Sequence, residues 1–163
     1  MTIDELNTYD RDRFVATLGW IFEHSPWVAE RTWASRPFES RDHLHRVMIE
    51  TMQAASRDEQ QALLCAHPDL GTKASMSDAS IGEQAGAGLD RLTPAEYQRL
   101  TTMTSAYQAR FDFPFVLAVK GRTKHDVVAI LGHRLLQSPD AEWQEALEQV
   151  GRIAAFRLRD AVD

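Results

Sequence analysis

The sequence contains one cysteine, Cys65, and no apolar run that approaches the ~20 residues of a membrane-spanning helix. A single cysteine excludes an internal disulfide and a cysteine-based metal cage, and it suits a reducing compartment. We expect Cys65 to be a small, buried apolar residue. The first residues are acidic and mixed, unlike the basic and then apolar start of a signal peptide. We therefore expect a cytoplasmic protein that does not enter a membrane.

Clustered positive charge is also missing. The chain has 18 Lys and Arg against 24 Asp and Glu, which gives a formal net charge of −6. This balance argues against a general nucleic-acid binder, because neutralising phosphates requires grouped Lys and Arg side chains. An anionic small molecule is still a possible ligand if local cationic groups or helix N-termini meet it. The length of 163 residues fits one domain spanning 1–163.

Helix-start signals recur along the chain, each with a Ser or Thr before a run of apolar residues at helical spacing. Ser56 and Thr93 are each followed three residues later by Glu, the pattern of a capping box, and Pro94 suits a first helical position. These signals predict a compact, all-α domain of about six to eight helices. The predicted helices cover residues 10–25, 26–34, 40–55, 56–66, 93–111, 123–137 and 138–162.

Two segments do not have a helical pattern. Residues 113–119, FPFVLAV, are apolar and partly β-branched, but no second strand is available to pair with them. We expect extended or helix-entry backbone there, because a lone strand cannot satisfy its own main-chain groups. Residues 67–90 are rich in glycine and small polar residues, so we expect a long irregular loop with a functional role.

His67 is the first candidate for chemistry. Pro68 disfavours helical backbone at the preceding residue, so the helix before it should end near Ala66. The carbonyl end of a helix favours imidazolium, which would make His67 a usable general acid. A helix cap or an ordinary surface histidine explains the same pattern equally well.

Glu83 is the second candidate. The segment SIGE, Ser80 to Glu83, has the spacing of a capping box, and that role alone explains both residues. The glycines that follow are unfavourable inside a helix, which indicates close packing or close approach of a ligand. Exposed amides at such a helix start would suit a carboxylate, so both a cap and an active-site role remain open for Glu83.

Arg157 is the third candidate. In the predicted C-terminal helix it falls on the same face as the apolar residues Leu147, Val150, Ala154 and Leu158. A guanidinium on a buried face needs a partner, and a carboxylate is the natural one. The alternative is an arginine whose stem packs while its head reaches solvent.

Motifs for metals and common cofactors are missing. No two histidines are spaced four apart, so a helix-borne zinc site has no support. The chain has no phosphate-binding loop, dinucleotide fingerprint or nucleophile elbow. We therefore expect a site without metal or organic cofactor.

Taken together, several motifs resemble the 2-oxo-4-hydroxy-4-carboxy-5-ureidoimidazoline (OHCU) decarboxylase family. They are HPDL at 67–70, SIGEQAGAGL at 80–89, a tyrosine at 107 followed by RFDFPFVLAVKG at 110–121, and IAAFRL at 153–158. FEHSPWVAERTW at 22–33 and RPF at 36–38 fit the same family. The motifs occur in the family's order over nearly the whole chain.

The resemblance implies a helical, usually dimeric enzyme that forms (S)-allantoin from an anionic ureidoimidazoline by loss of CO2 and stereospecific protonation. It implies no cofactor. The catalytic residues would be His67 as the acid, Glu83 and Arg157. Substrate would be bound by Pro68, Ser80, Ile81, Gly82, Glu83, Gln84, Phe115, Val116, Leu117, Ala118 and Val119.

Two positions depart from the family pattern. Asp112 stands where glycine is usual, and Thr104 stands where asparagine is common. A non-catalytic helical module that binds a ureide or purine derivative is the alternative function.

Overall fold

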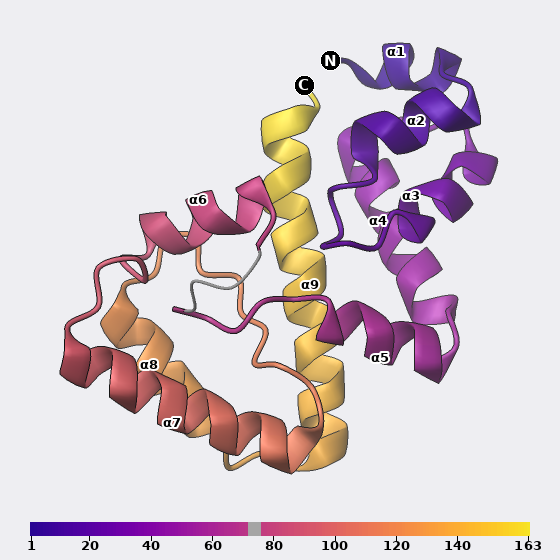
Figure 1. The fold of residues 1–163 in the computed structure, drawn as a ribbon. Helices are drawn as coiled ribbons and strands as arrows, with labels where there is room; N and C mark the ends of the chain where they lie inside the picture. The colour runs from indigo at the N-terminus through magenta and orange to yellow at the C-terminus, as the bar shows by residue number, and fades with distance from the viewer. Residues whose placement is uncertain (72–75) are drawn as a thin grey trace. The chain divides into compact units, whose positions relative to one another are not determined.

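The computed structural model describes residues 1–71 and 76–163, and this described part is all-α, as the sequence predicts (Figure 1). No strand forms among these residues. Residues 72–75 of the predicted loop lie outside the described residues. The α-helices are α1 (Ile3–Thr8), α2 (Arg11–Leu18), α3 (Trp27–Thr32), α4 (Arg41–Ala54), α5 (Arg57–Cys65), α6 (Asp78–Gly86), α7 (Pro94–Phe111), α8 (Lys124–Arg134) and α9 (Pro139–Ala161).

The described chain divides into two compact units, which we describe separately. The first unit comprises Met1–Ala66 and Val150–Asp163, and the second comprises His67–Gln149. A single domain over residues 1–163 stays a prediction. Within the described residues, no helix is both long enough and apolar enough to cross a membrane.

Local capping chemistry explains where most helices begin. The predicted caps at Ser40, Ser56 and Thr93 are confirmed, since each side chain accepts a hydrogen bond from the main chain three residues later. Helix α1 is an additional helix that the sequence analysis missed, although Thr2 and Glu5 form a capping box there. These helix starts are therefore specified by capping residues that lie within three positions of one another.

Helix α2 is shorter than the predicted 10–25, because it ends at Leu18. Gly19 follows it, and a Cβ at this glycine would lie 2.6 Å from the Val15 carbonyl oxygen and 3.2 Å from Cβ of Pro26. A residue without a side chain is needed for this close approach. The turn leads into a buried irregular segment that includes Ile21 and Phe22.

The first unit has an apolar core between its helices. Helix α3 packs against both α2 and α4. The C-terminal part of α9 adds a buried stripe to the unit. The buried apolar side chains of the unit include Leu6, Phe14, Leu18, Val28, Leu44, Met48, Met52, Leu63, Val150, Ala154 and Leu158.

The second unit is built around α7, α8 and a cluster of aromatic rings. Tyr107 lies with its ring centroid 4.6 Å from Phe111 and 5.3 Å from Phe115. Phe113 contacts both Tyr107 and Trp143 edge-on. Residues 113–119, which we call the strap, are buried and form neither a helix nor a strand.

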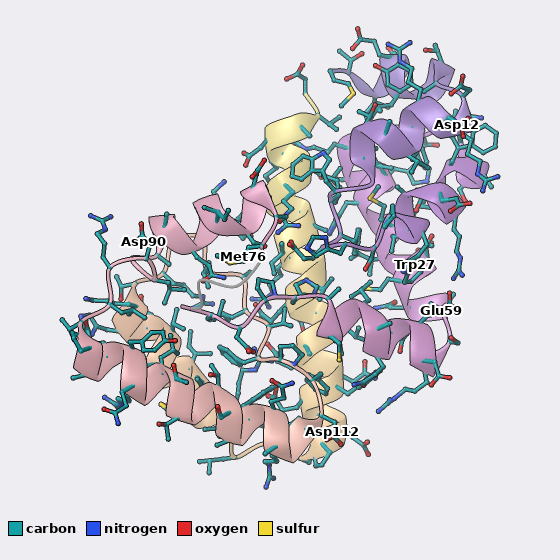
Figure 2. The ribbon with its side chains drawn as sticks, in the orientation of Figure 1. Asp12, Trp27, Glu59, Met76, Asp90 and Asp112 are labelled. Atoms are coloured by element: carbon teal, nitrogen blue, oxygen red, sulfur yellow. The ribbon has the colours of Figure 1, made fainter. Side chains whose placement is uncertain are left out.

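Asp112 lies at the C-terminal end of α7 (Figure 2). It has a left-handed conformation, with φ of 62° and ψ of 20°. This conformation is strained for residues with a Cβ and is most readily adopted by glycine. The structure therefore gives a physical reason for the glycine that the resemblance expects at this position. At the second departure, Thr104 is buried and donates its hydroxyl to the Thr101 carbonyl oxygen at 3.1 Å.

The predicted burial of Cys65 is wrong. Cys65 is exposed, because it lies on the face of α5 opposite the buried Leu63 and Leu64. In the first turn of α7, Tyr97 is 48% exposed, whereas Leu100 is buried.

Candidate functional site

His67 is buried at the point where the sequence predicts a helix to end. Helix α5 stops at Cys65, and its C-cap is Ala66. His67 follows directly and is 8% exposed, and Pro68 after it is half-buried. The imidazole is thus buried, which excludes an ordinary surface histidine.

The capping-box alternative for Ser80 and Glu83 is excluded. The N-cap of α6 is Ser77, whose hydroxyl accepts a hydrogen bond from the Ser80 amide at 3.2 Å. A second serine three residues earlier therefore begins the helix before Ser80. The Ile81 amide also donates to the Ser77 carbonyl oxygen at 3.0 Å. The amides of Ser80 and Ile81 therefore already donate hydrogen bonds within the first turn of α6. They are not exposed groups that could bind a carboxylate.

Helix α6 divides the predicted site residues between two faces. Ser80 and Gln84 are buried and Glu83 is half-buried, whereas Ile81 and Gly82 are exposed. Residues three and four apart share a face of a helix, so Ser80, Glu83 and Gln84 point to the same side.

Gln84 joins the segment after His67 to α6. Its side-chain oxygen accepts a hydrogen bond from the Gly71 amide at 2.9 Å. Gly71 has φ of 75°, and a Cβ there would lie 2.8 Å from Cδ2 of Leu100. The glycine that follows HPDL therefore permits both the turn and this packing, and the structure brings two of the predicted motifs together.

A buried ion pair supports the strap from one side. Glu142 of α9 accepts hydrogen bonds from Nε and Nη2 of Arg134 and from the hydroxyl of Tyr107. Burial raises the pKa of the Tyr107 hydroxyl, and its hydrogen bond to Glu142 raises this pKa further. Arg134 also donates through Nη1 to the Val116 carbonyl oxygen. The pair therefore fixes one peptide group of the strap.

Two other side chains hold the next part of the strap. The Ala118 amide donates to Oε1 of Gln149 at 3.0 Å, and Nε of Arg122 donates to the Ala118 carbonyl oxygen at 3.3 Å. Gln149 is itself oriented by a 2.8 Å hydrogen bond to Glu145. Among the described residues, none forms a hydrogen bond to the main chain of Leu117, which lies between these anchored peptides.

Arg157 is buried, as its helical phase predicts, and its partner is Glu23. Nη2 of Arg157 lies 2.8 Å from Oε2 of Glu23, and the two side chains are 3% and 0% exposed. Nη1 donates to the carbonyl oxygens of Trp20 and Ile21 at 3.2 and 3.4 Å. The predicted carboxylate partner is confirmed, and a guanidinium that reaches solvent is excluded. Arg157 belongs to the first unit, whereas His67 and Glu83 belong to the second.

The sequence-based predictions did not include Arg134 and Glu23. Arg134 could have been predicted to be buried, because it follows Val127 and Leu131 on the buried face of α8 as Arg157 follows the apolar stripe of α9. Glu23 stands in the motif at 22–33, but it lies in a non-helical segment, so no helical phase indicates that it is buried.

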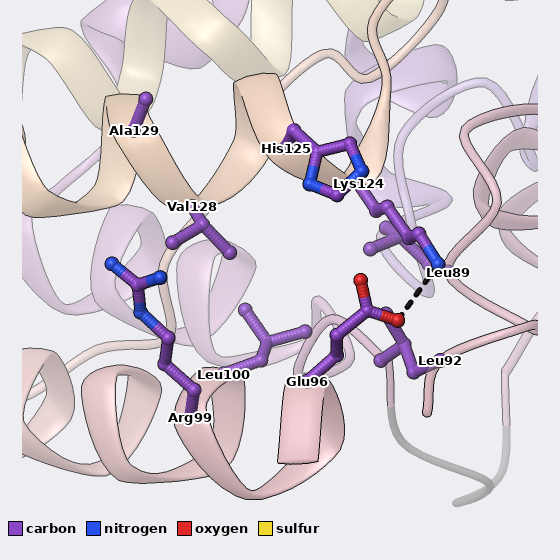
Figure 3. A pocket seen from close by; sticks show the side chains of 9 residues that line it. All are labelled: Leu89, Leu92, Glu96, Arg99, Leu100, Lys124, His125, Val128 and Ala129. Atoms are coloured by element: carbon purple, nitrogen blue, oxygen red, sulfur yellow. Dashed lines mark hydrogen bonds and ion pairs between the residues drawn. The ribbon is translucent and has the colours of Figure 1, made fainter. Parts of the chain in front are cut away.

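The second unit also contains a cavity of about 390 Å³, shown in Figure 3. An ion pair between Lys124 and Glu96 lies on one side of it, with Arg99 on the other and Leu100 and Val128 between them (Figure 3). None of the predicted site residues lines this cavity. In the described ranges 1–71 and 76–163, no three or more His, Cys, Asp or Glu side chains are grouped to hold a metal ion.

Comparisons with known proteins agree with the motifs. A family model described as OHCU decarboxylase matches residues 7–159. The chain is 45% identical to the OHCU decarboxylase of Halalkalicoccus jeotgali, over 98% of this chain and 91% of that protein. It is 48% identical to the uric acid degradation bifunctional protein PucL of Bacillus subtilis, over 99% of this chain but 33% of that protein.

Solved structures show the same relationship. A crystal structure of (S)-allantoin synthase matches with a TM-score of 0.79 and 36% identity, over 100% of this chain and 55% of that one. An OHCU decarboxylase solved with (S)-allantoin matches with a TM-score of 0.71 and 18% identity, over 93% and 97% of the two chains, and it shows the fold alone. The chain therefore belongs to the OHCU decarboxylase family and is a carboxy-lyase.

Proposed function

We propose that this chain decarboxylates OHCU and protonates the product to give (S)-allantoin, in the breakdown of urate. The observation that carries the proposal is the 45% identity to an OHCU decarboxylase over almost the full length of both chains. The similarity of the structure to an (S)-allantoin synthase supports the same reaction.

His67 is the general acid of the proposed mechanism. Loss of CO2 breaks the bond between the ring carbon and the carboxylate, and the electron pair moves into the neighbouring unsaturated ring system. A proton delivered to one face of the ring then creates the stereocentre. A buried imidazole can deliver this proton from a fixed direction, which supports His67 as the group that determines the chirality of the product.

The strap offers main-chain N–H and carbonyl groups to the substrate ring. A cyclic ureide carries N–H donors and carbonyl acceptors, the same groups that a peptide offers. Leu117 has no main-chain hydrogen bond to the described residues, although it is buried between anchored peptides. Buried peptide groups are almost always paired, so the strap, including Phe115 to Val119, is suited to hold the ring.

Glu83 and Arg157 complete the proposed site. Glu83 is half-buried on the face of α6 that also carries Ser80 and Gln84, where a carboxylate can orient the imidazole or accept a substrate N–H. Arg157 would bind the substrate carboxylate or stabilise the charge that moves into the ring. Pro68, Ile81 and Gly82 remain proposed binding residues.

A turnover assay on freshly generated OHCU tests this function. The chain should accelerate formation of (S)-allantoin, followed by circular dichroism, together with release of CO2. His67→Asn should lose about 100-fold or more of the acceleration, the range expected for removal of a general acid. A chain that binds allantoin in calorimetry but does not accelerate its formation would instead be the non-catalytic ureide-binding module.

The matched control is His133→Asn, which makes the same change at an exposed histidine on α8. Its activity should equal that of the unchanged chain. If His67→Asn kept full activity and product chirality, the assignment of the acid would be wrong. Fast CO2 release with racemic allantoin would show that His67 acts in protonation alone.

We also propose a cytoplasmic homodimer. Support comes from the exposed thiol of Cys65, which forms no disulfide and which a reducing compartment would preserve, and from Leu136, an apolar side chain that is 82% exposed. Size-exclusion chromatography with light scattering should give twice the chain mass of 18.5 kDa. A monomer at micromolar concentration would contradict the dimer.

A further inference from the structure

The ion pair between Arg157 and Glu23 buries two charges, which packing alone does not require. Both members of the Arg157–Glu23 pair are almost fully buried, and the guanidinium also donates to two carbonyl oxygens. Burying two charges carries a large desolvation cost, and well-packed apolar residues in their place are often as stable or more stable. A buried pair of this kind is therefore weak evidence for a role in stability, and a role in function explains the two charges better.

The backbone around Glu23 is shaped to direct its carboxylate inward. His24 has φ of 45°, a left-handed conformation that is uncommon for residues other than glycine. The Ser25 hydroxyl donates to the Glu23 carbonyl oxygen at 2.9 Å, which holds the same turn. Strained backbone of this kind persists where the surrounding structure requires a particular geometry.

The charge of Glu23 also matters for a decarboxylation. The substrate carboxylate is charged before the bond breaks and becomes neutral CO2 afterwards. An arginine without a counter-charge would bind the starting carboxylate more strongly than the transition state, and this would raise the barrier. A buried carboxylate beside the guanidinium reduces that ground-state binding and also fixes the orientation of the guanidinium.

We infer that Glu23 is a positioning residue for the reaction, which acts by orienting Arg157 and balancing its charge. This inference rests on the proposed role of Arg157 in binding the substrate. The motif at 22–33 contains Glu23 but gives it no role, because only the folded chain brings it to Arg157, 134 positions away.

Glu23→Gln tests the inference, because it keeps the shape of the side chain and removes its charge. We expect kcat per folded molecule to fall about tenfold or more, with KM unchanged or lower, since the starting carboxylate is then bound at least as strongly. The control Glu30→Gln removes an exposed carboxylate that pairs with Arg11 in the same unit, and it should leave kcat and KM unchanged. A kcat of Glu23→Gln within twofold of the unchanged chain, or a raised KM alone, would overturn the inference.

A second variant covers the case in which Glu23→Gln does not fold. Glu23→Asp keeps the charge but draws the carboxylate back by one methylene, which displaces the guanidinium. Its kcat should also fall about tenfold, because small displacements of a positioned group have large effects on rate. Unchanged kcat in a folded Glu23→Asp would overturn the inference.

The two proposals fail in different ways. If the unchanged chain does not convert OHCU, the proposed function is wrong. If the unchanged chain converts it, His67→Asn is inactive and Glu23→Gln has normal kcat and KM, only the role of Glu23 is wrong.

Discussion

The ion pair between Arg134 and Glu142 makes a sharp prediction about stability. In Glu142→Leu the guanidinium of Arg134 stays buried without its carboxylate, and the Tyr107 hydroxyl loses its acceptor. Glu142 accepts hydrogen bonds from Nε and Nη2 of Arg134 at 3.1 and 2.9 Å, and its side chain is fully buried. Breaking one side of such a pair costs about 3 to 5 kcal/mol of the free energy of unfolding.

Urea denaturation followed by far-UV circular dichroism measures this cost. With a slope of about 2 kcal/mol per molar urea, the midpoint should fall by about 2 M. The control Glu148→Leu makes the same substitution at an exposed position of α9 and should change the free energy of unfolding by less than about 0.5 kcal/mol.

The double variant Arg134→Met/Glu142→Leu distinguishes two causes of instability. One is the loss of the attraction between the two side chains, and the other is the cost of burying the Arg134 charge without a partner. Because it removes both charges, it should be more stable than Glu142→Leu. A loss below about 1 kcal/mol in Glu142→Leu would refute this reasoning. A double variant less stable than Glu142→Leu would show that the pair itself, and not the stranded charge, supplies the stability.

Two further predictions concern the surface of the second unit. Asp112→Gly should raise the free energy of unfolding by about 1 kcal/mol, because glycine removes the strain of the left-handed cap. Calorimetry should show a midpoint of thermal unfolding about 2 to 4 °C higher, and a lower midpoint would contradict the strain. The hydrogen bond from Lys124 holds the pKa of Glu96 at about 2, below its usual value of 4.5, so this carboxylate adds stability above pH 4.5 that is lost as the pH falls toward 2. In Lys124→Met the free energy of unfolding should therefore fall less between these two pH values, and an unchanged pH dependence in urea titrations would contradict the pairing.

Helices were predictable from the sequence because their signals are local. The caps at Ser40, Ser56 and Thr93 depend on residues within one turn of helix, and the structure confirms them. The start of α6 was not predictable by the same rule, because Ser77 and Ser80 are both acceptable caps three residues apart. Spacing alone does not distinguish them, and the capping box considered for Ser80 does not form.

The candidate site was predictable only in part. Helical phase shows that Arg157 is buried and needs a carboxylate, and the structure confirms both points. It does not identify Glu23, because the two residues are 134 positions apart and their contact depends on tertiary folding. The supports of the strap, Arg134 and Gln149, come from separate helices and were missed for the same reason.

The way in which the strap is held has a consequence for how this site can evolve. In a β-sheet, each strand shares its hydrogen bonds with its neighbours, so one peptide group cannot be reoriented without disturbing the whole ladder. Here the Val116 carbonyl and the Ala118 amide each depend on a different side chain, Arg134 and Gln149. A single substitution can therefore redirect one peptide and leave the next in place, so the main-chain groups that the strap presents can change by one mutation at a time.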